Sequence, residues 1–303
     1  MARFDYKLLY ALHTVMQEQS FEGAALKLHI SQSAVSQRIK ALEEYVAQPV
    51  IIRGQPIIAT AAGQKLLRHY RQVQQLESVL NDELLFDESG QEVNISVAVN
   101  ADSVATWFIS AIAPLLKSRA VALNLVILDE TRTTQKLKSG EACAAISSQG
   151  RMLPGYRVFE LGKVKYLLVA SPAFKEKYFP DGIKTDSLQL APGVCFDAKD
   201  NMHTRFIEQH FGLSADSYPR HTVPSSEAFV ELARQGIAYC LIPELQIKQE
   251  LAGGDLVNLL PDKAHIETLY WHTWGLAGGI YRELAQLIQT RGREMLTEKS
   301  IEV

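Results

Sequence analysis

The sequence has few cysteines, and the three it contains are widely separated. Cys143, Cys195 and Cys240 are an odd number and form no Cys-x-x-Cys pair, which excludes a disulfide framework and a zinc knuckle. We expect them to be small buried hydrophobic residues. A redox-sensing thiol is the alternative, and it requires an accessible cysteine with a lowered pKa.

Long apolar runs are also missing. No uninterrupted apolar stretch approaches the length that spans a membrane, and no positively charged segment precedes an apolar run at the N-terminus. We therefore expect a cytoplasmic protein with no membrane partner.

Enzyme signatures are absent as well. The sequence contains no phosphate-binding loop, no H-E-x-x-H pair and no G-x-S-x-G elbow. His203 and His210 could share a helix, but no carboxylate lies at ligand spacing, so we expect them at the surface. The sequence predicts a protein that is not an enzyme and that holds no metal or cofactor.

The size and charge of the chain indicate two different parts. Its 303 residues exceed the usual size of one domain, and 47% hydrophobic residues give ample apolar surface for packed cores. Nine basic and five acidic residues precede position 72, whereas 22 basic and 29 acidic residues follow from there on. A basic N-terminal part on an acidic body is typical of a protein that binds nucleic acid at one end.

Three short helices are predicted at the N-terminus. Apolar residues recur at helical spacing from residue 5 to about residue 20, and residues 21–28 form an alanine-rich segment whose small side chains let another helix approach closely. Ser31 offers an N-cap to the third helix. The apolar stripe of that helix consists of Ala34, Val35, Ile39, Leu42 and Val46.

The other face of this third helix is polar and can contact base edges or phosphates. It carries Gln32, Ser33, Ser36, Gln37, Arg38 and Lys40. No carboxylate occurs in the helix before Glu43, which favours insertion into the major groove, because carboxylates would repel phosphates there. A generic three-helix bundle with a solvated polar face is the alternative.

A wing is predicted after the third helix. Residues 48–58 read as two short extended runs around a turn that contains glycine. Arg53 at the tip is placed to meet the DNA backbone or the minor groove, and a solvated turn arginine is the alternative. We predict a winged helix-turn-helix domain over residues 1–59.

These motifs resemble those of the LysR-type regulators. The resemblance rests on residues 21–28 (FEGAALKL), residues 31–43 (SQSAVSQRIKALE) and residues 60–63 (TAAG). Farther along, residues 97–107, 129–133 and 225–230 are similar to those of the members that respond to arginine and lysine. The resemblance spans nearly the whole chain.

The resemblance implies a homodimer, assembled further into a tetramer, that binds double-stranded AT-rich or bent promoter DNA. It implies activation of a basic amino-acid exporter through RNA polymerase, with lysine and arginine as opposed effectors. By position, Gln32, Ser33, Ser36 and Gln37 face bases, while Arg38, Lys40 and Arg53 hold phosphate or groove edges. Ser33 and Ala34 stand where many relatives have paired prolines, so the resemblance does not fix the base preference at that point.

A linker helix is predicted between the two parts, over residues 60–88. Thr60 caps it, and apolar residues then recur every three or four positions at Leu66, Tyr70, Val73, Leu76, Leu80 and Leu84. The pattern is typical of a dimerising helix, and a helix packed on its own domain is the alternative.

Apolar runs then alternate with helical stretches, which indicates parallel strands with covering helices in an effector-binding domain over residues 92–303. Strands are predicted over residues 93–99, 123–128, 142–148, 164–170, 193–196, 220–223, 239–243 and 268–274. The expected fold class is α/β with the two-lobed architecture of periplasmic binding proteins, which the family resemblance implies. Lobe one covers residues 92–162 and 267–303, and lobe two covers residues 163–266.

In such lobes the ligand lies at the carboxyl ends of strands, where helix N-termini present free N–H groups. The candidate effector-binding residues at these junctions are Asn100, Asp102, Ser103, Asp129, Glu130, Thr131, Ser147, Ser148, Ser225, Ser226 and Glu227. A cationic ligand needs a carboxylate to offset its desolvation. Asp102, Asp129, Glu130 and Glu227 can supply it, and helix capping or a solvated loop charge is the alternative for each.

The sequence therefore predicts a DNA-binding transcription regulator whose second domain senses lysine or arginine. Two other functions fit parts of the pattern. One is an architectural protein that binds AT-rich or bent DNA and affects replication initiation. The other is a ligand-binding protein with no role on DNA.

Overall fold

The computed structural model describes residues 4–84, 93–276 and 278–296. The chain divides into two compact units, the first built on residues up to 91 and the second on most of the remainder. None of the described helices is long and apolar enough to cross a membrane.

The first unit is a helical bundle with a two-stranded wing. Its elements are α1 (Tyr6–Glu18), α2 (Phe21–Leu28), α3 (Gln32–Val46), β1 (Ile51–Ile52), β2 (Ile58–Ala59) and α4 (Ala61–Leu84). β1 and β2 pair in antiparallel fashion. The predicted helix-turn-helix and wing are both present at their predicted positions.

Side-chain caps fix where these helices begin, as expected from the polar residues that precede them. The Ser20 and Ser31 hydroxyls accept hydrogen bonds from the backbone N–H groups of Gly23 and Ala34, both at 3.2 Å. Thr60 was predicted to cap α4, and its hydroxyl accepts from Gly63 N at 3.1 Å. That prediction is confirmed.

The second unit has one mixed sheet in the order β10-β6-β11-β5-β3-β4, with β9 paired to β6. β3 (Val93–Val99) runs parallel to β4 (Val121–Ile127) and β5 (Ala144–Ser147), as predicted. β6 (Tyr156–Ala170) and β11 (His265–Trp274) are antiparallel to each other along their length. The chain passes from one lobe to the other along these two strands. The predicted lobe boundaries, between residues 162 and 163 and between residues 266 and 267, therefore fall inside β6 and β11.

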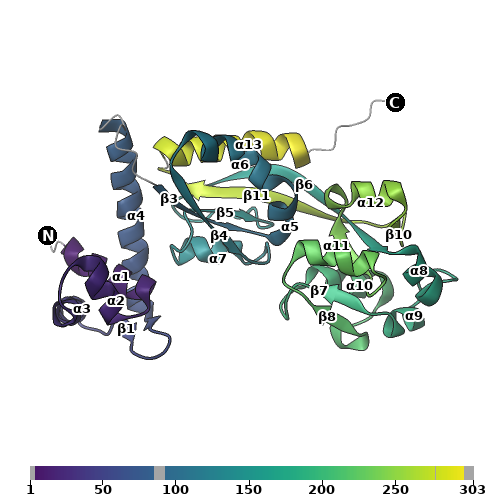
Figure 1. Ribbon diagram of the computed structural model, residues 1–303, viewed down its shortest axis with the longest axis horizontal. Helices are drawn as coiled ribbons and strands as arrows, with labels where there is room; N and C mark the ends of the chain where they lie inside the picture. Colours follow the sequence, from purple (N-terminus) through teal and green to yellow (C-terminus); the bar gives the residue numbers. More distant parts are fainter. Residues whose placement is uncertain (1–3, 85–92, 277, 297–303) are drawn as a thin grey trace. The chain divides into compact units, whose positions relative to one another are not determined.

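Helices flank this sheet (Figure 1). They are α5 (Ala101–Ser103), which continues through the π-helical turn η1 (Val104–Phe108) into α6 (Ile109–Ser118), then α7 (Thr133–Lys138) and α13 (Gly279–Leu296). Trp107 is buried, and Gly292 of α13 lies so close to it that a Cβ there would be 3.4 Å from the indole. α13 therefore packs against the π-helical turn η1.

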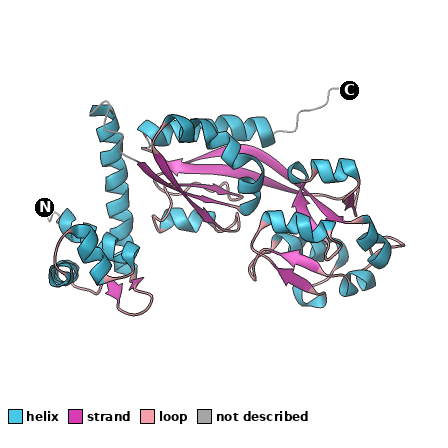
Figure 2. Ribbon diagram, viewed as in Figure 1, coloured by secondary structure: helices cyan, strands magenta, loops and turns pink. Residues whose placement is uncertain are grey.

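The rest of the second unit forms the second lobe, in which short strands lie among helices (Figure 2). Its elements are α8 (Pro172–Tyr178), α9 (Thr185–Leu190), β7 (Gly193–Cys195), α10 (Met202–Phe211), η2 (Ala215–Ser217), β8 (Arg220–Thr222), α11 (Ser226–Arg234), β9 (Cys240–Pro243), η3 (Glu244–Gln246), α12 (Lys248–Gly253) and β10 (Val257–Asn258). β7 and β8 are parallel. The predicted two-lobed α/β fold is confirmed.

Two of the three cysteines lie in the interior of this unit. Cys195 and Cys240 are buried, as expected, whereas Cys143 is half-buried. Burial raises the pKa of the Cys240 thiol, which makes it a poor thiolate and supports a packing role there.

Candidate functional site

The polar face of α3 is presented to solvent by the packing of its apolar stripe. Val35, Ile39 and Leu42 are buried in the core of the first unit. On the outer side, Gln32, Ser33, Gln37 and Lys40 are exposed, and Ser36 and Arg38 are half-buried. All six predicted α3 residues are thus at least partly accessible, and Arg38 lies on a different side of the helix from Ser36.

Two of these polar side chains form no hydrogen bond or ion pair with the described part of the first unit. In residues 4–84, the Gln37 and Arg38 side chains have no hydrogen bond or ion pair with other described residues. Lys40 lies 3.6 Å from Glu44, and both side chains are largely exposed, so this pair contributes little. These groups are free to bind another molecule.

The wing places Arg53 beside α2. Arg53 is exposed, and its guanidinium carbon lies 5.4 Å from the centre of the Phe21 ring. Such stacking holds an arginine without neutralising its charge, so Arg53 remains available to an anionic group such as a phosphate.

The linker helix α4 has two different halves. Leu66 and Tyr70 are buried in the core of the first unit. Leu76 and Leu80, one turn apart, are 41% and 51% exposed. The first half therefore packs on its own domain, and the second half presents apolar residues that no described part of the unit covers. Leu84 lies among residues whose side chains are not described.

A cavity lies between the two lobes of the second unit, where strands of the sheet end. Lobe one contributes Asn100, Ala101, Asp102, Leu128, Asp129 and Glu130, and lobe two contributes Tyr166, Phe196, Asp200, Met202, His203, Ser226, Phe229 and Leu241. Four of these are carboxylates, and no described lysine or arginine lines the cavity. The electrostatics favour a cationic ligand.

Asp102 connects the two sides of this cavity. Its carboxylate accepts hydrogen bonds from Tyr166 Oη at 2.9 Å and from Ser226 Oγ at 2.6 Å. Ser226 begins α11, so the second bond joins helices of both lobes. Burial raises the pKa of Asp102, although these two donors act in the opposite direction.

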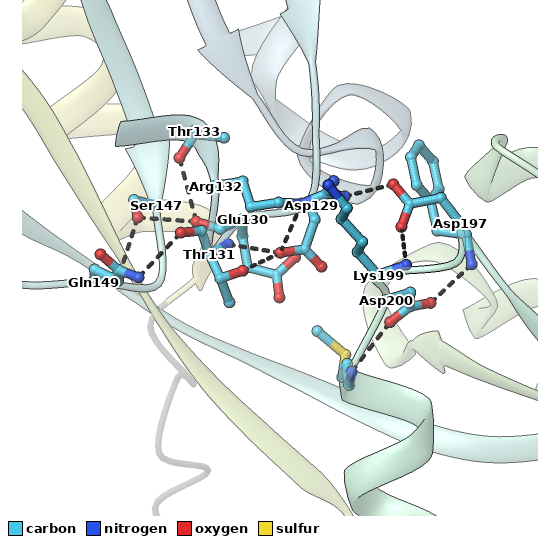
Figure 3. A network of polar contacts seen from close by, with 12 residues as sticks. Asp129, Glu130, Thr131, Arg132, Thr133, Ser147, Gln149, Asp197, Lys199 and Asp200 are labelled. Atoms are coloured by element: carbon cyan, nitrogen blue, oxygen red, sulfur yellow. Dashed lines mark hydrogen bonds and ion pairs between the residues drawn. The ribbon is translucent and has the colours of Figure 1, made fainter. Parts of the chain in front are cut away.

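Asp129 takes part in a second connection between the lobes (Figure 3). It accepts from the Thr131 backbone N at 3.0 Å and from the Thr131 hydroxyl. Arg132 Nε lies 3.8 Å from Asp129, and Arg132 Nη2 donates to Asp197 Oδ2 at 2.5 Å. Because Asp197 follows β7, Arg132 bridges lobe one to lobe two.

Glu130 is held by its backbone, and its side chain faces the cavity. Its carbonyl oxygen accepts hydrogen bonds from Ser147 Oγ at 2.9 Å, Thr133 Oγ1 at 3.2 Å and Ser148 N at 3.2 Å. The residue is 6% exposed. Burial, together with the neighbouring Asp129 charge, raises the pKa of Glu130 to about 8.

Asn100 supplies a polar group with no internal partner. It is 3% exposed, and among the described residues neither its side-chain nitrogen nor its side-chain oxygen has a hydrogen-bond partner. A buried amide in this state costs free energy unless something binds to it. Because Asn100 lines the cavity, a ligand can satisfy it.

Five of the predicted effector-binding residues line the cavity: Asn100, Asp102, Asp129, Glu130 and Ser226. Three others support them from behind, since Thr131 binds Asp129 while Ser147 and Ser148 bind the Glu130 carbonyl.

The remaining three predicted residues lie outside the cavity. Ser103 lines a neighbouring groove. Ser225 caps α11 through Ala228 N, and its hydroxyl donates to the exposed Glu227.

Several cavity residues carried no recognised signal in the sequence. Asp200 accepts from the backbone N–H groups of Phe196 and Met202, at 2.8 and 3.1 Å, and burial raises its pKa. His203 was expected at the surface, but it is 3% exposed, and its ring lies 6.1 Å from that of Tyr218 and 5.3 Å from that of Tyr239. That expectation was wrong, because His203 lies on the buried face of α10 with Phe206 and Ile207.

Two family models match the chain. The bacterial regulatory helix-turn-helix protein, lysR family, matches residues 6–64, and the LysR substrate binding domain matches residues 87–274. The chain is 53% identical to the HTH-type transcriptional regulator ArgP of Aeromonas salmonicida, over 98% of this chain and 99% of that protein. It is 47% identical to ArgP of Salmonella arizonae, over 98% and 100% of the two chains.

Solved structures of full-length proteins also resemble the whole chain. ArgP from Mycobacterium tuberculosis is 33% identical, with a TM-score of 0.84 and coverage of 97% of this chain and 99% of that one. Full-length LysG from Corynebacterium glutamicum with bound effector Arg is 30% identical, with a TM-score of 0.76 and coverage of 97% and 100%.

Proposed function

The chain belongs to the LysR family of bacterial helix-turn-helix regulators and is a DNA-binding transcription regulator, and we propose that its effector is arginine or lysine. The observation that carries this proposal is the acidic cavity, in which Asp102, Asp129, Glu130 and Asp200 meet without a described lysine or arginine in the lining. A cationic side chain offsets this charge, whereas an anionic ligand adds to the repulsion.

The remaining cavity groups suit the rest of an amino acid. The Asn100 amide has a free donor and a free acceptor, which can bind the polar end of the ligand. Phe196, Met202 and Phe229 offer apolar surface to the aliphatic stem of lysine or arginine. The likeness to LysG, whose structure holds arginine, supports the same class.

On DNA, we assign base contacts to Gln32, Ser33, Ser36 and Gln37 and contacts to phosphate or groove edges to Arg38, Lys40 and Arg53. The exposure of the α3 face and the unneutralised Arg53 support this assignment. The active form is a homodimer joined through the second half of α4, where Leu76 and Leu80 are exposed. Dimers assemble further into a tetramer.

The effector acts by shifting a population of lobe arrangements, because the cavity residues come from both lobes and a ligand that binds all of them favours the closed form. That change alters the spacing of the paired α3 helices on DNA. The protein works in the cytoplasm, where it meets promoter DNA and RNA polymerase, and its targets concern amino-acid export or metabolism.

Calorimetric titration of the full chain with arginine, lysine and two neutral analogues tests the effector class. Citrulline has the shape of arginine, and norleucine has the aliphatic stem of lysine, but both lack the side-chain charge. We expect the neutral analogues to bind about 100-fold more weakly, because an uncharged side chain forms no ion pair with the cavity carboxylates. Equal affinity for arginine and citrulline would show that the cavity does not select a cation.

A further inference from the structure

The four carboxylates of the effector cavity are not equivalent. The Asp102 carboxylate accepts hydrogen bonds from the hydroxyls of Tyr166 and Ser226. The Asp129 carboxylate accepts one from Thr131 N, and the Asp200 carboxylate accepts two from backbone N–H groups. Among the described residues, no side-chain donor and no ion pair reaches the Glu130 carboxylate, which interacts only with its own backbone N–H. Glu130 is therefore the one cavity carboxylate without compensation from another residue.

The charges around Glu130 do not supply that compensation. The titratable groups that face it are Asp129, Asp102 on α5, Glu267 on β11 and Tyr166 on β6, with Asp200 and His203 across the cavity. Arg132, two residues along the chain, is engaged by Asp129 and Asp197. Burial lowers the pKa of His203 to about 4, so that ring is neutral at physiological pH.

A carboxylate that is 6% exposed and surrounded by other acids is unstable as an anion. Burial and the Asp129 charge raise the pKa of Glu130 to about 8. In the empty cavity at neutral pH, Glu130 is therefore mostly a neutral carboxylic acid. A bound ammonium or guanidinium group would reverse that preference, because it supplies the missing positive charge.

We propose that Glu130 pairs with the cationic side-chain group of the effector and that effector binding is coupled to release of the Glu130 proton to solvent. This inference rests on the proposed function and deepens it. The exchange balances, since one O–H bond of Glu130 is broken, the proton goes to the buffer and the ligand cation takes its place. The net charge of the cavity is the same before and after binding.

The coupling makes effector affinity depend on pH. Below the pKa of Glu130, each unit of falling pH weakens apparent binding about tenfold, because the proton competes with the ligand. With a pKa of about 8, binding at pH 8 is expected to be about 50-fold tighter than at pH 6. The regulator would then respond to its effector most sensitively when internal pH is high.

The test is calorimetric titration of the full-length protein with arginine at pH 7, in buffers with different ionisation enthalpies. About 0.9 proton should be released per arginine bound. Glu130→Gln should abolish the release and flatten the dependence of affinity on pH. Glu176→Gln, an exposed carboxylate on α8, should leave both unchanged.

The outcomes separate this inference from the proposed function. Arginine binding with the same heat in every buffer and the same affinity from pH 6 to pH 8 would overturn the proton coupling and leave the effector class standing. No binding of arginine or lysine at any pH would overturn the effector class itself. The buffer comparison uses the unmodified protein, so the result does not depend on the folding of the Glu130→Gln variant.

Discussion

The Arg132–Asp197 ion pair offers a direct way to perturb closure of the two lobes. Arg132 follows β4 and Asp197 follows β7, and their side chains, 2.5 Å apart at the closest atoms, are 21% and 35% exposed. Because the effector cavity is lined from both lobes, we predict that breaking this pair weakens effector binding although no cavity carboxylate is substituted.

The size of the effect follows from the exposure of the pair. A charge-assisted hydrogen bond contributes roughly 1.5–3 kcal/mol when well formed and less when solvent screens it. With Asp197 about one-third exposed, we expect a coupling of about 1–2 kcal/mol, which is a ~5–30-fold change in Kd. Arg132→Ala should cost more than Asp197→Asn, because it also leaves the 7%-exposed Asp129 side chain without its nearby cation.

A double-mutant cycle measures this coupling. The affinity for arginine is determined by calorimetry in the unmodified protein, Arg132→Ala, Asp197→Asn and the double variant. Asp197→Asn is the gentler change, since an amide oxygen can still accept the bond that Lys199 N donates at 2.7 Å. Non-additive effects that shrink as salt is raised are expected.

The control is an ion pair that lies within one element. Arg291 and Glu294 of α13 are 2.8 Å apart and each is 52% exposed, and breaking this pair should change Kd less than about twofold. Strictly additive effects of Arg132→Ala and Asp197→Asn on Kd would refute the idea that their contact holds the lobes together.

Three further predictions concern DNA reading and stability. Arg38→Ala should weaken binding to all DNA sequences and flatten the salt dependence of the affinity, whereas Gln37→Ala should mainly change sequence preference. DNA titrations at several salt concentrations test this. An Arg38→Ala affinity that depends on salt as steeply as that of the unmodified protein would contradict the phosphate contact. Gly63→Ala should destabilise the first unit by about 2 kcal/mol or more, because its Cβ would lie 2.0 Å from a backbone carbonyl oxygen. Gly54→Ala, whose nearest contact would be 3.5 Å, is the matched control in thermal melting, and equal melting temperatures would contradict the steric argument. Burial lowers the pKa of His203 to about 4. The neutral ring therefore contributes fully to the free energy of unfolding above pH 6.5, and this contribution is lost as pH falls toward 4. The melting temperature of His203→Phe should depend less on pH across that interval. The same pH dependence as in the unmodified protein would show that His203 does not cause it.

Much of the first unit could be predicted because its signals are local. The apolar stripe of α3 fixes which face is buried, and the capping residues Ser20, Ser31 and Thr60 precede their helices directly. The exposure of Gln37 and Lys40 follows from that stripe. The divided role of α4 could not be predicted, since one periodic pattern continues from the buried Leu66 to the exposed Leu80.

The cavity was only partly predictable because it joins distant segments. Asn100, Asp129 and Ser226 each follow a predicted strand or begin a predicted helix, so their positions could be inferred locally. Asp200 and His203 reach the same cavity only through the tertiary packing of lobe two, where His203 lies against Tyr218 and Tyr239, and no local pattern encodes that packing. The first half of β6 was missed because its alternation of exposed and half-buried residues includes several charges.

The most direct test of the whole account is the affinity of the purified protein for AT-rich promoter DNA at fixed salt, measured with and without arginine and lysine. We predict tight binding that at least one of the two amino acids changes, because the effector cavity and the DNA-reading helix belong to one chain. Tight binding that neither amino acid alters would leave the DNA-binding function in place and contradict the effector assigned to the cavity.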